Sequence, residues 1–344
     1  MYVGSDVHKK NSNYTMVDGQ GTEVEKGRFP TTCEGLNEFA SELPEGAKVA
    51  IEASTSGIFV YEYLDERGIE VHLAHPVYVK PFAKKHVKTD NVDAGVLAQL
   101  LRMDYLPESY VPGKEIRDLR TLVRHRASLV RLRTSIKNRV HALLTIEGVQ
   151  PPKVSDIFGR KGMEFLREVK LRQSRRTALD NYLEVLGVLN AAIKRVETIL
   201  REKAKVTEEA RWLMSIVGIG FHNALLILSE IGEIERFSKP KSFVCYAGLA
   251  PKVEQSGDYT RYGHINKHSN GFLRWALIQS TRAAVHSSKP NRFQRIYRRL
   301  KARRGEKVAI VATARHMAES VYWVLTKREY YKEENKAIRA SSFS

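Results

Sequence analysis

Four carboxylates have residue types and settings that suit metal-assisted chemistry. Asp6 falls within the strand-like segment YVGSDV, Glu52 lies in the apolar segment VAIEA, and Asp90 and Asp93 stand three residues apart in KTDNVDAG. Carboxylates brought together supply the hard oxygen ligands that Mg²⁺ or Mn²⁺ prefers. Two such ions can activate a nucleophile and stabilise the leaving oxygen of a phosphodiester. The sequence therefore predicts a site for Mg²⁺ (or Mn²⁺) made by Asp6, Glu52, Asp90 and Asp93.

Simpler interpretations stay open for three of these residues. Asp6 could end a strand, and Asp90 with Asp93 could form the start of a helix as N-cap and N3 residues. Glu52 fits these interpretations poorly, because a carboxylate placed in a buried strand is costly unless it is paired, neutralised or bound to a metal. Glu52 therefore requires a partner.

The elements that must position these carboxylates alternate between strands and helices. Three consecutive strands are expected at 2–7, 13–18 and 24–29 as an antiparallel meander, followed by a helix after Thr32. A buried strand at 48–54, a helix at 58–68, a strand at 69–75 and a helix over 88–103 complete the pattern. The predicted fold of residues 1–110 is an α/β domain with a mixed sheet in the order βββαβαβ.

The rest of the chain is predicted to be mostly helical. Apolar residues recur at helical spacing over 115–145 and again over 178–205, so residues 111–206 are expected to form an antiparallel, coiled-coil-like arm. This arm could serve as a spacer or for dimerisation, or it could be a plain intramolecular bundle. A C-terminal domain is expected over 207–330, with a polar tail at 331–344.

The charges are distributed unevenly along the chain. The 344 residues carry 57 Lys and Arg against 39 Asp and Glu, but residues 1–110 hold 11 and 17, whereas residues 111–344 hold 46 and 22. A basic body of this size attracts polyanions and indicates nucleic-acid binding, although a solvated basic surface would look the same. No signal peptide or membrane-spanning segment is expected, and Cys33 and Cys245 match no zinc or redox spacing, so a cytoplasmic location is predicted.

Several motifs together resemble one family. GSDVHK, IEAS and HVKTDNVDA in the first part, and SIVGIGFHNALLILSEIGEIERF, YAGLAPKVEQSG and FLRWAL in the second, resemble the DEDD transposases of the insertion sequence 110 family, which are RNA-guided serine recombinases. The element order likewise resembles the RNase H/RuvC-like nuclease fold. The resemblance spans nearly the whole chain and implies that the protein cuts and rejoins DNA strands.

The resemblance also assigns roles to matching residues. Asp6, Glu52, Asp90 and Asp93 correspond to the metal-binding tetrad, and Ser256 to the serine that forms a phosphoserine link with DNA. Residue chemistry could not have selected Ser256, because Ser-Gly is a common turn dipeptide. The family further implies donor and target DNA, a guide RNA encoded in the element, dimers that assemble into a tetramer, and association with the nucleoid when active.

Further residues are candidates for contact with nucleic acid. They are basic side chains of the arm and of the region around Ser256, and two glycines of a Gly-x-Gly turn that resembles a helix-hairpin-helix: Arg124, Arg131, Gly218, Gly220, Arg261, Lys267 and Arg274. The glycines could equally form a tight turn between core helices. Two other functions stay open: a RuvC-like hydrolytic nuclease or junction resolvase, and a nucleic-acid-binding protein without catalysis.

Overall fold

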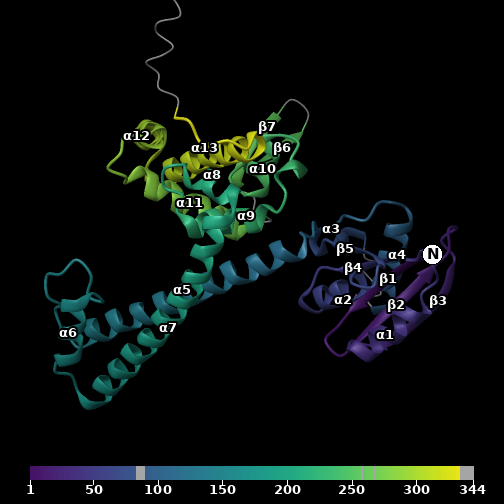
Figure 1. The fold of residues 1–344 in the computed structure, drawn as a ribbon, viewed down its shortest axis with the longest axis horizontal. Coiled ribbons are helices and arrows are strands. Elements are labelled where there is room, and N and C mark those ends of the chain that lie inside the picture. Colours follow the sequence, from purple (N-terminus) through teal and green to yellow (C-terminus); the bar gives the residue numbers. More distant parts are fainter. Residues whose placement is uncertain (83–89, 257–258, 266–268, 334–344) are drawn as a thin grey trace, which may run out of the picture. The chain divides into compact units, whose positions relative to one another are not determined.

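The structure is a computed structural model that describes residues 1–82, 90–256, 259–265 and 269–333 (Figure 1). The chain divides into two compact units, Met1–Val111, called unit 1 here, and Pro112–Ser344, called unit 2. Among the helices of the described segments, none combines the length and the apolar character that crossing a membrane requires.

Unit 1 is built on a mixed five-stranded sheet in the order β3-β2-β1-β4-β5. The strands β1 (Tyr2–Val7), β2 (Asn11–Val17) and β3 (Glu23–Pro30) form the predicted antiparallel meander. The strands β4 (Lys48–Glu52) and β5 (Glu70–Ala74) run parallel to β1. The predicted mixed sheet is therefore confirmed.

Helices cover both faces of this sheet. On one face, α1 (Cys33–Glu42) and α2 (Thr55–Asp65) lie over a core that includes Val3, Val49 and Ile51. Each begins after a side-chain cap, with Thr32 Oγ1 accepting from Gly35 N and Ser54 Oγ from Gly57 N. On the other face, α4 (Asp90–Arg102) packs against β1 and β4. The short helix α3 (Pro76–Val79) and the 3₁₀ turn η1 (Lys80–Phe82) come before α4 in the chain.

Unit 2 begins with two long antiparallel helices, α5 (Lys114–Ile146) and α7 (Gln173–Val206) (Figure 1). Their pairing is marked along its length by Arg126 with Glu197 and by Arg172 with Glu147. Between them, after an irregular segment that contains Pro151 and Pro152, lies α6 (Arg160–Glu168). This short helix was not predicted; Gly162 allows it to pack directly on the backbone of Ile157.

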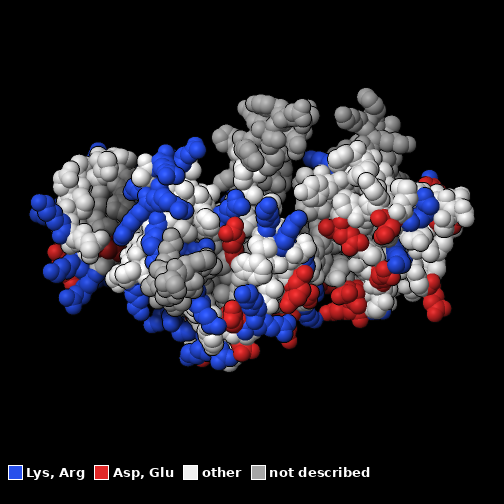
Figure 2. All heavy atoms as spheres, turned by 90° about the horizontal axis from the view of Figure 1, so that it is seen from above, with Lys and Arg blue, Asp and Glu red and all other residues white. Residues whose placement is uncertain are grey.

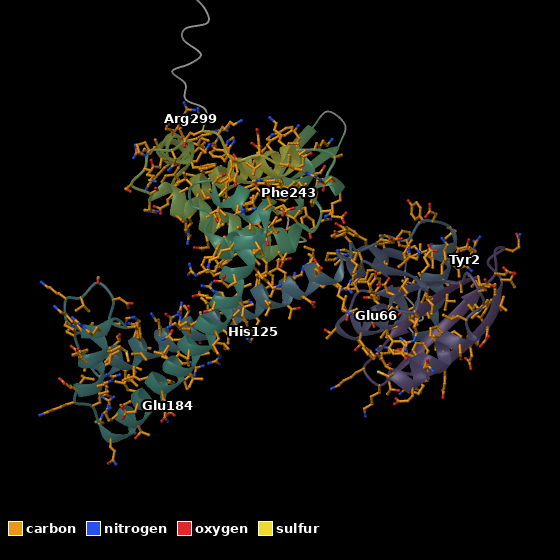
Figure 3. All side chains as sticks on the ribbon, viewed as in Figure 1. Tyr2, Glu66, His125, Glu184, Phe243 and Arg299 are labelled. Atoms are coloured by element: carbon orange, nitrogen blue, oxygen red, sulfur yellow. The ribbon has the colours of Figure 1, made fainter. Side chains whose placement is uncertain are left out.

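The remainder of unit 2 is a helical core with one small antiparallel sheet. Its elements are α8 (Glu208–Met214), α9 (Phe221–Ile231), η2 (Ile234–Arg236), α10 (Pro240–Tyr246), β6 (Pro251–Ser256), β7 (Tyr259–Ile265), α11 (Gly271–Val285), α12 (Arg292–Arg304) and α13 (Glu306–Lys327). Phe243, labelled in Figure 3, is fully buried at the centre of this core. Because the same core includes Leu119 of α5 and Leu200 of α7, the boundary at 206/207 between arm and C-terminal domain stays a prediction.

Candidate active site

Asp6 and Glu52 lie side by side at the ends of two parallel strands. In the β1–β4 ladder Ser5 pairs with Ile51, so Asp6 and Glu52 are the next residues on neighbouring strands. Side chains alternate along a strand, which places Glu52 on the same face as Ala50. Ala50 packs with the α4 residues Leu97 and Leu100, so Glu52 belongs to the face that α4 covers.

Gly4 brings α4 into backbone contact with β1. A Cβ atom on Gly4 would lie 2.0 Å from the carbonyl oxygen of Ala94 and 2.5 Å from the nitrogen of Ala98, so no larger residue fits there. Gly4 and Asp6 point to the same side of β1 because they are two residues apart. Asp6 therefore also faces α4.

The direction of α4 decides which of its ends meets the carboxylates. Near its C-terminus, Gln99 Nε2 donates to the carbonyl of Gly21, at the end of the sheet where β1 begins. The N-terminal end of α4, which carries Asp90 and Asp93, consequently points toward the end of β1 that carries Asp6. The fold thus directs the ends of β1 and β4 that carry Asp6 and Glu52, and the N-terminal end of α4, toward the same edge of the sheet of unit 1.

The individual carboxylates are set differently. Asp6 has 17% of its side chain exposed, and its Oδ2 lies 3.2 Å from Nε2 of His8. Glu52 was predicted in the middle of a buried strand, but it is the last residue of β4 and half-buried, since the strand ends there. Asp93 is also half-buried, whereas the side chain of Asp90 lies outside the described residues.

The donor set suits a hard cation, because it consists of carboxylate oxygens. Among the side chains that the structure describes, no three His, Cys, Asp or Glu residues lie close enough together to hold a metal ion. The fourth carboxylate, Asp90, is not among those side chains. The chemistry of the four predicted donors fits Mg²⁺, and their role as its ligands is a proposal.

The predicted nucleophile lies in the small sheet of unit 2. Ser256 is the last residue of β6, and its backbone pairs with Tyr259 of β7. Arg261 is on β7 opposite Glu254. The side chains of Ser256 and Arg261, and the whole of Lys267, lie outside the described residues. Arg274, on α11, donates from Nη1 to Ser269 Oγ at 3.2 Å.

A buried ion pair joins the arm to the core of unit 2. Glu230 of α9 has no exposed side-chain surface, and Arg124 of α5 binds it through two hydrogen bonds of 2.7 Å. Asn270 Nδ2 donates a third hydrogen bond to Glu230 Oε2. The sequence analysis missed this pair, although the signal was present: Glu230 stands in an apolar run, as Glu52 does. Arg131, by contrast, is exposed, over the ring of Phe272.

The two glycines of the Gly-x-Gly turn differ in their surroundings. Gly218 has a φ of +95°, and a Cβ there would lie 2.2 Å from the carbonyl oxygen of Ser280. Gly220, the N-cap of α9, has open space around it. Gly218 is therefore required for the turn and for close packing on α11, which is the simpler of the two interpretations, while Gly220 can still approach a phosphate.

One buried histidine was also not anticipated from the sequence. His222, in the first turn of α9, has both ring nitrogens buried without a hydrogen-bond partner among the described residues. Burial lowers the pKa of His222 to about 4, and the positive charge of Arg126 contributes to the same shift. His222 is therefore neutral near pH 7.

The charge asymmetry of the sequence is visible on the surface. Asp and Glu gather over unit 1, and Lys and Arg over unit 2 (Figure 2). Basic surface of this extent suits a polyanionic partner. The carboxylate edge and the basic surface therefore belong to different units of the chain.

Known protein families match both parts of the chain. A family model of the IS110 DEDD type, described as "Transposase", matches residues 3–147, and the model "Transposase IS116/IS110/IS902 family" matches residues 210–298. The chain is thus a transposase, an enzyme that cuts and rejoins DNA.

Bacterial relatives agree with both models. The chain is 29% identical over 299 residues to the transposase for insertion sequence element IS1111A of Coxiella burnetii, covering 83% of this chain and 79% of the relative. It is 28% identical over 318 residues to a probable family 20 transposase of Pseudomonas aeruginosa, covering 86% and 88%. The chain belongs to the IS110 family of insertion-sequence transposases.

Proposed function

We propose that this transposase exchanges DNA strands through a metal site at Asp6, Glu52, Asp90 and Asp93 and a serine nucleophile at Ser256. The observation that carries the proposal is the convergence of β1, β4 and the N-terminal end of α4 at one sheet edge. The strand order β3-β2-β1-β4-β5, with β1, β4 and β5 parallel, supports an RNase H/RuvC-like fold for unit 1.

In this mechanism the carboxylates of Asp6, Glu52, Asp90 and Asp93 would hold Mg²⁺ or Mn²⁺, and the bound ion would supply stabilisation of negative charge on phosphate oxygens. The hydroxyl of Ser256 is a weak nucleophile, so a nearby base must take its proton. Its Oγ then forms a bond to the DNA phosphorus, and the bond to the bridging oxygen of the strand breaks. The resulting phosphoserine link conserves the phosphodiester energy, so the strand can be rejoined without ATP.

The partners belong to the same proposal. Donor and target DNA are the substrates, and an element-encoded RNA that pairs with them selects the sites. The basic surface of unit 2 supports contact with nucleic-acid backbones (Figure 2). A dimer, assembling further into a tetramer, brings the carboxylate edge of one chain to Ser256 of another.

The covalent adduct tests the proposal. Ser256→Ala should abolish a denaturation-resistant protein–DNA adduct while DNA affinity is retained, and Asp6→Asn should reduce the adduct together with the dependence on added Mg²⁺. Ser288→Ala, which removes an exposed hydroxyl after α11, is the matched serine control and should retain the adduct. Strand cleavage that persists in Ser256→Ala without an adduct would instead support a hydrolytic nuclease.

A further inference from the structure

A pocket in unit 2 combines aromatic rings with cations and includes none of the residues that the mechanism uses. Its volume is about 430 Å³, and it lies between the C-terminal part of α13, the segment that follows, and the start of α12. The residues that line it include Arg292, Trp323, Lys327, Tyr330 and Lys332. Apart from Arg292, these residues lie beyond 298, where the second family model ends.

The aromatic side chains are more exposed than a core would leave them. Trp323 is 48% exposed and Tyr330 is 55% exposed. The hydroxyl of Tyr331 is buried next to the side chains of Arg292 and Ser320. Exposed aromatic rings leave apolar surface in water, so these residues suit a ligand with a flat ring that can stack on them.

The cations are placed next to the rings. Lys327 Nζ lies 5.8 Å from the centre of the Trp323 ring, and Arg292 lies near the Tyr331 hydroxyl. One acid, Glu329, also lines the pocket and pairs with Lys332 at 3.3 Å. Arg292 and Lys327 therefore give the pocket a positive charge that Glu329 does not cancel.

A basic helix continues from the pocket. The thirteen residues of α12 carry seven Lys and Arg and no Asp or Glu. Arg292, Arg295 and Arg299 follow at spacings of three and four, so they share one face of α12. Arg299 lies on the surface of the helix (Figure 3), while Arg295 pairs with Glu333 at 3.5 Å. A chain of phosphates leaving the pocket would meet this face.

We propose that the pocket binds an unpaired nucleotide of a single-stranded nucleic acid. The base stacks on Trp323 and Tyr330, and the flanking phosphates contact Arg292, Lys327 and the arginine face of α12. Aromatic platforms beside a positive groove are how proteins hold single strands without reading their sequence. A duplex does not satisfy the pocket, because its bases are already stacked on one another. The site uses neither the carboxylates nor Ser256.

Intrinsic fluorescence gives a direct test on the full chain without added metal. The three tryptophans are Trp212, which is buried, and Trp275 and Trp323, which are 39% and 48% exposed. Single-stranded DNA and RNA oligonucleotides of about 15 nucleotides should quench the fluorescence by stacking. The quenching should disappear in Trp323→Phe and persist in Trp275→Phe. Quenching that survives in Trp323→Phe would overturn the proposal.

Affinity provides the second measurement. Trp323→Ala should weaken binding of the single strand about 5- to 150-fold relative to Trp275→Ala, as expected for losing one stacked base. Lys327→Gln should lower the salt dependence of binding by about one phosphate contact. A loss of affinity for single-stranded DNA, RNA or both supports the site and identifies which nucleic acid it binds. Equal affinity in the two alanine variants, or equal loss for duplex DNA and for an acidic peptide, would contradict it. Adduct formation by Ser256 is scored separately, so failure here leaves the proposed mechanism standing.

Discussion

At the scale of single residues, the same sequence signal has two structural outcomes. Glu52 and Glu230 are both carboxylates in apolar runs, and the same physics requires a partner for each. Glu230 is fully buried and is neutralised inside unit 2 by Arg124, whereas Glu52 lies half-buried at the end of β4. The sequence could indicate a carboxylate in an apolar run, but it could not tell the internal ion pair of Glu230 from the half-buried strand end at which Glu52 lies.

The buried ion pair predicts that two arginines of the arm differ in their contribution to the free energy of unfolding. Arg124→Ala should lower the free energy of unfolding by about 2 kcal/mol, because the buried Glu230 loses two hydrogen bonds to a charged group and keeps only the more distant Arg120, at 3.9 Å, as a counter-ion. Arg131→Ala, which removes an exposed side chain, should leave stability within about 0.5 kcal/mol. Denaturant unfolding followed by circular dichroism distinguishes them. Equal stability of the two variants would mean that Arg124 is available for nucleic acid.

His222 should make stability depend on pH. Its pKa is about 4 in the folded protein, below the ordinary value of 6.5, so the unfolded chain binds more protons between these values. Stability from this group is fully present above pH 6.5 and is lost as the pH falls toward 4. Between about pH 7 and pH 5 the loss should be about 2 kcal/mol.

The matched variant is His222→Phe, which keeps an aromatic ring but cannot be protonated. Its unfolding midpoint in urea should fall less than that of the unmodified chain between about pH 7 and pH 5. An identical fall in both proteins would show that other groups cause the pH dependence.

At the scale of elements, periodic patterns were predictable and short packed segments were not. The meander β1–β3, the cap of α1 and the antiparallel pairing of α5 with α7 followed from alternation, a capping residue and apolar spacing. The cap of α2 did not, because Ser54 was assigned to the preceding strand. The helix α6 and the strands β6 and β7 were not predicted, because their polar sequences resemble connections and their pairing depends on tertiary contacts. The candidate sites divide in the same way: the carboxylates could be singled out from the sequence, but the pocket around Trp323 could not.

The contact between α4 and β1 is what places Asp90 and Asp93, and Gly4 makes it possible. Gly4→Ala should destabilise unit 1 by about 3 kcal/mol, since its Cβ would meet backbone atoms of α4 that cannot move aside. Gly95→Ala is the control on the same interface, because its Cβ would lie 3.9 Å from Thr15 Cγ2, an ordinary contact. Thermal unfolding measures both. If Gly4→Ala were as stable as Gly95→Ala, α4 would not pack on β1 as described.

At the scale of the whole molecule, the residues of the proposed mechanism are divided between the two units. The carboxylates lie in acidic unit 1 and Ser256 lies in basic unit 2. This division agrees with the proposed assembly, in which a symmetric dimer can complete two sites by exchanging parts between chains. Such an arrangement keeps the carboxylates, which repel DNA phosphates, on a different unit from the basic surface that attracts DNA.

Mixing two inactive variants tests whether a site is shared between chains. If the carboxylates of one chain serve Ser256 of another, Asp6→Asn and Ser256→Ala chains that are unfolded and refolded together should regain covalent adduct. Random pairing into dimers predicts recovery of about a quarter of the original sites. The adduct should form on the Asp6→Asn chain, which retains its serine, and a size tag on either chain identifies the carrier on a denaturing gel.

The double variant Asp6→Asn with Ser256→Ala, mixed with the unmodified chain, should suppress more adduct than dilution explains, because every mixed dimer then lacks a complete site. Absence of recovery in the first mixture, with half of the adduct surviving in the second, would instead place both parts of the site within one chain.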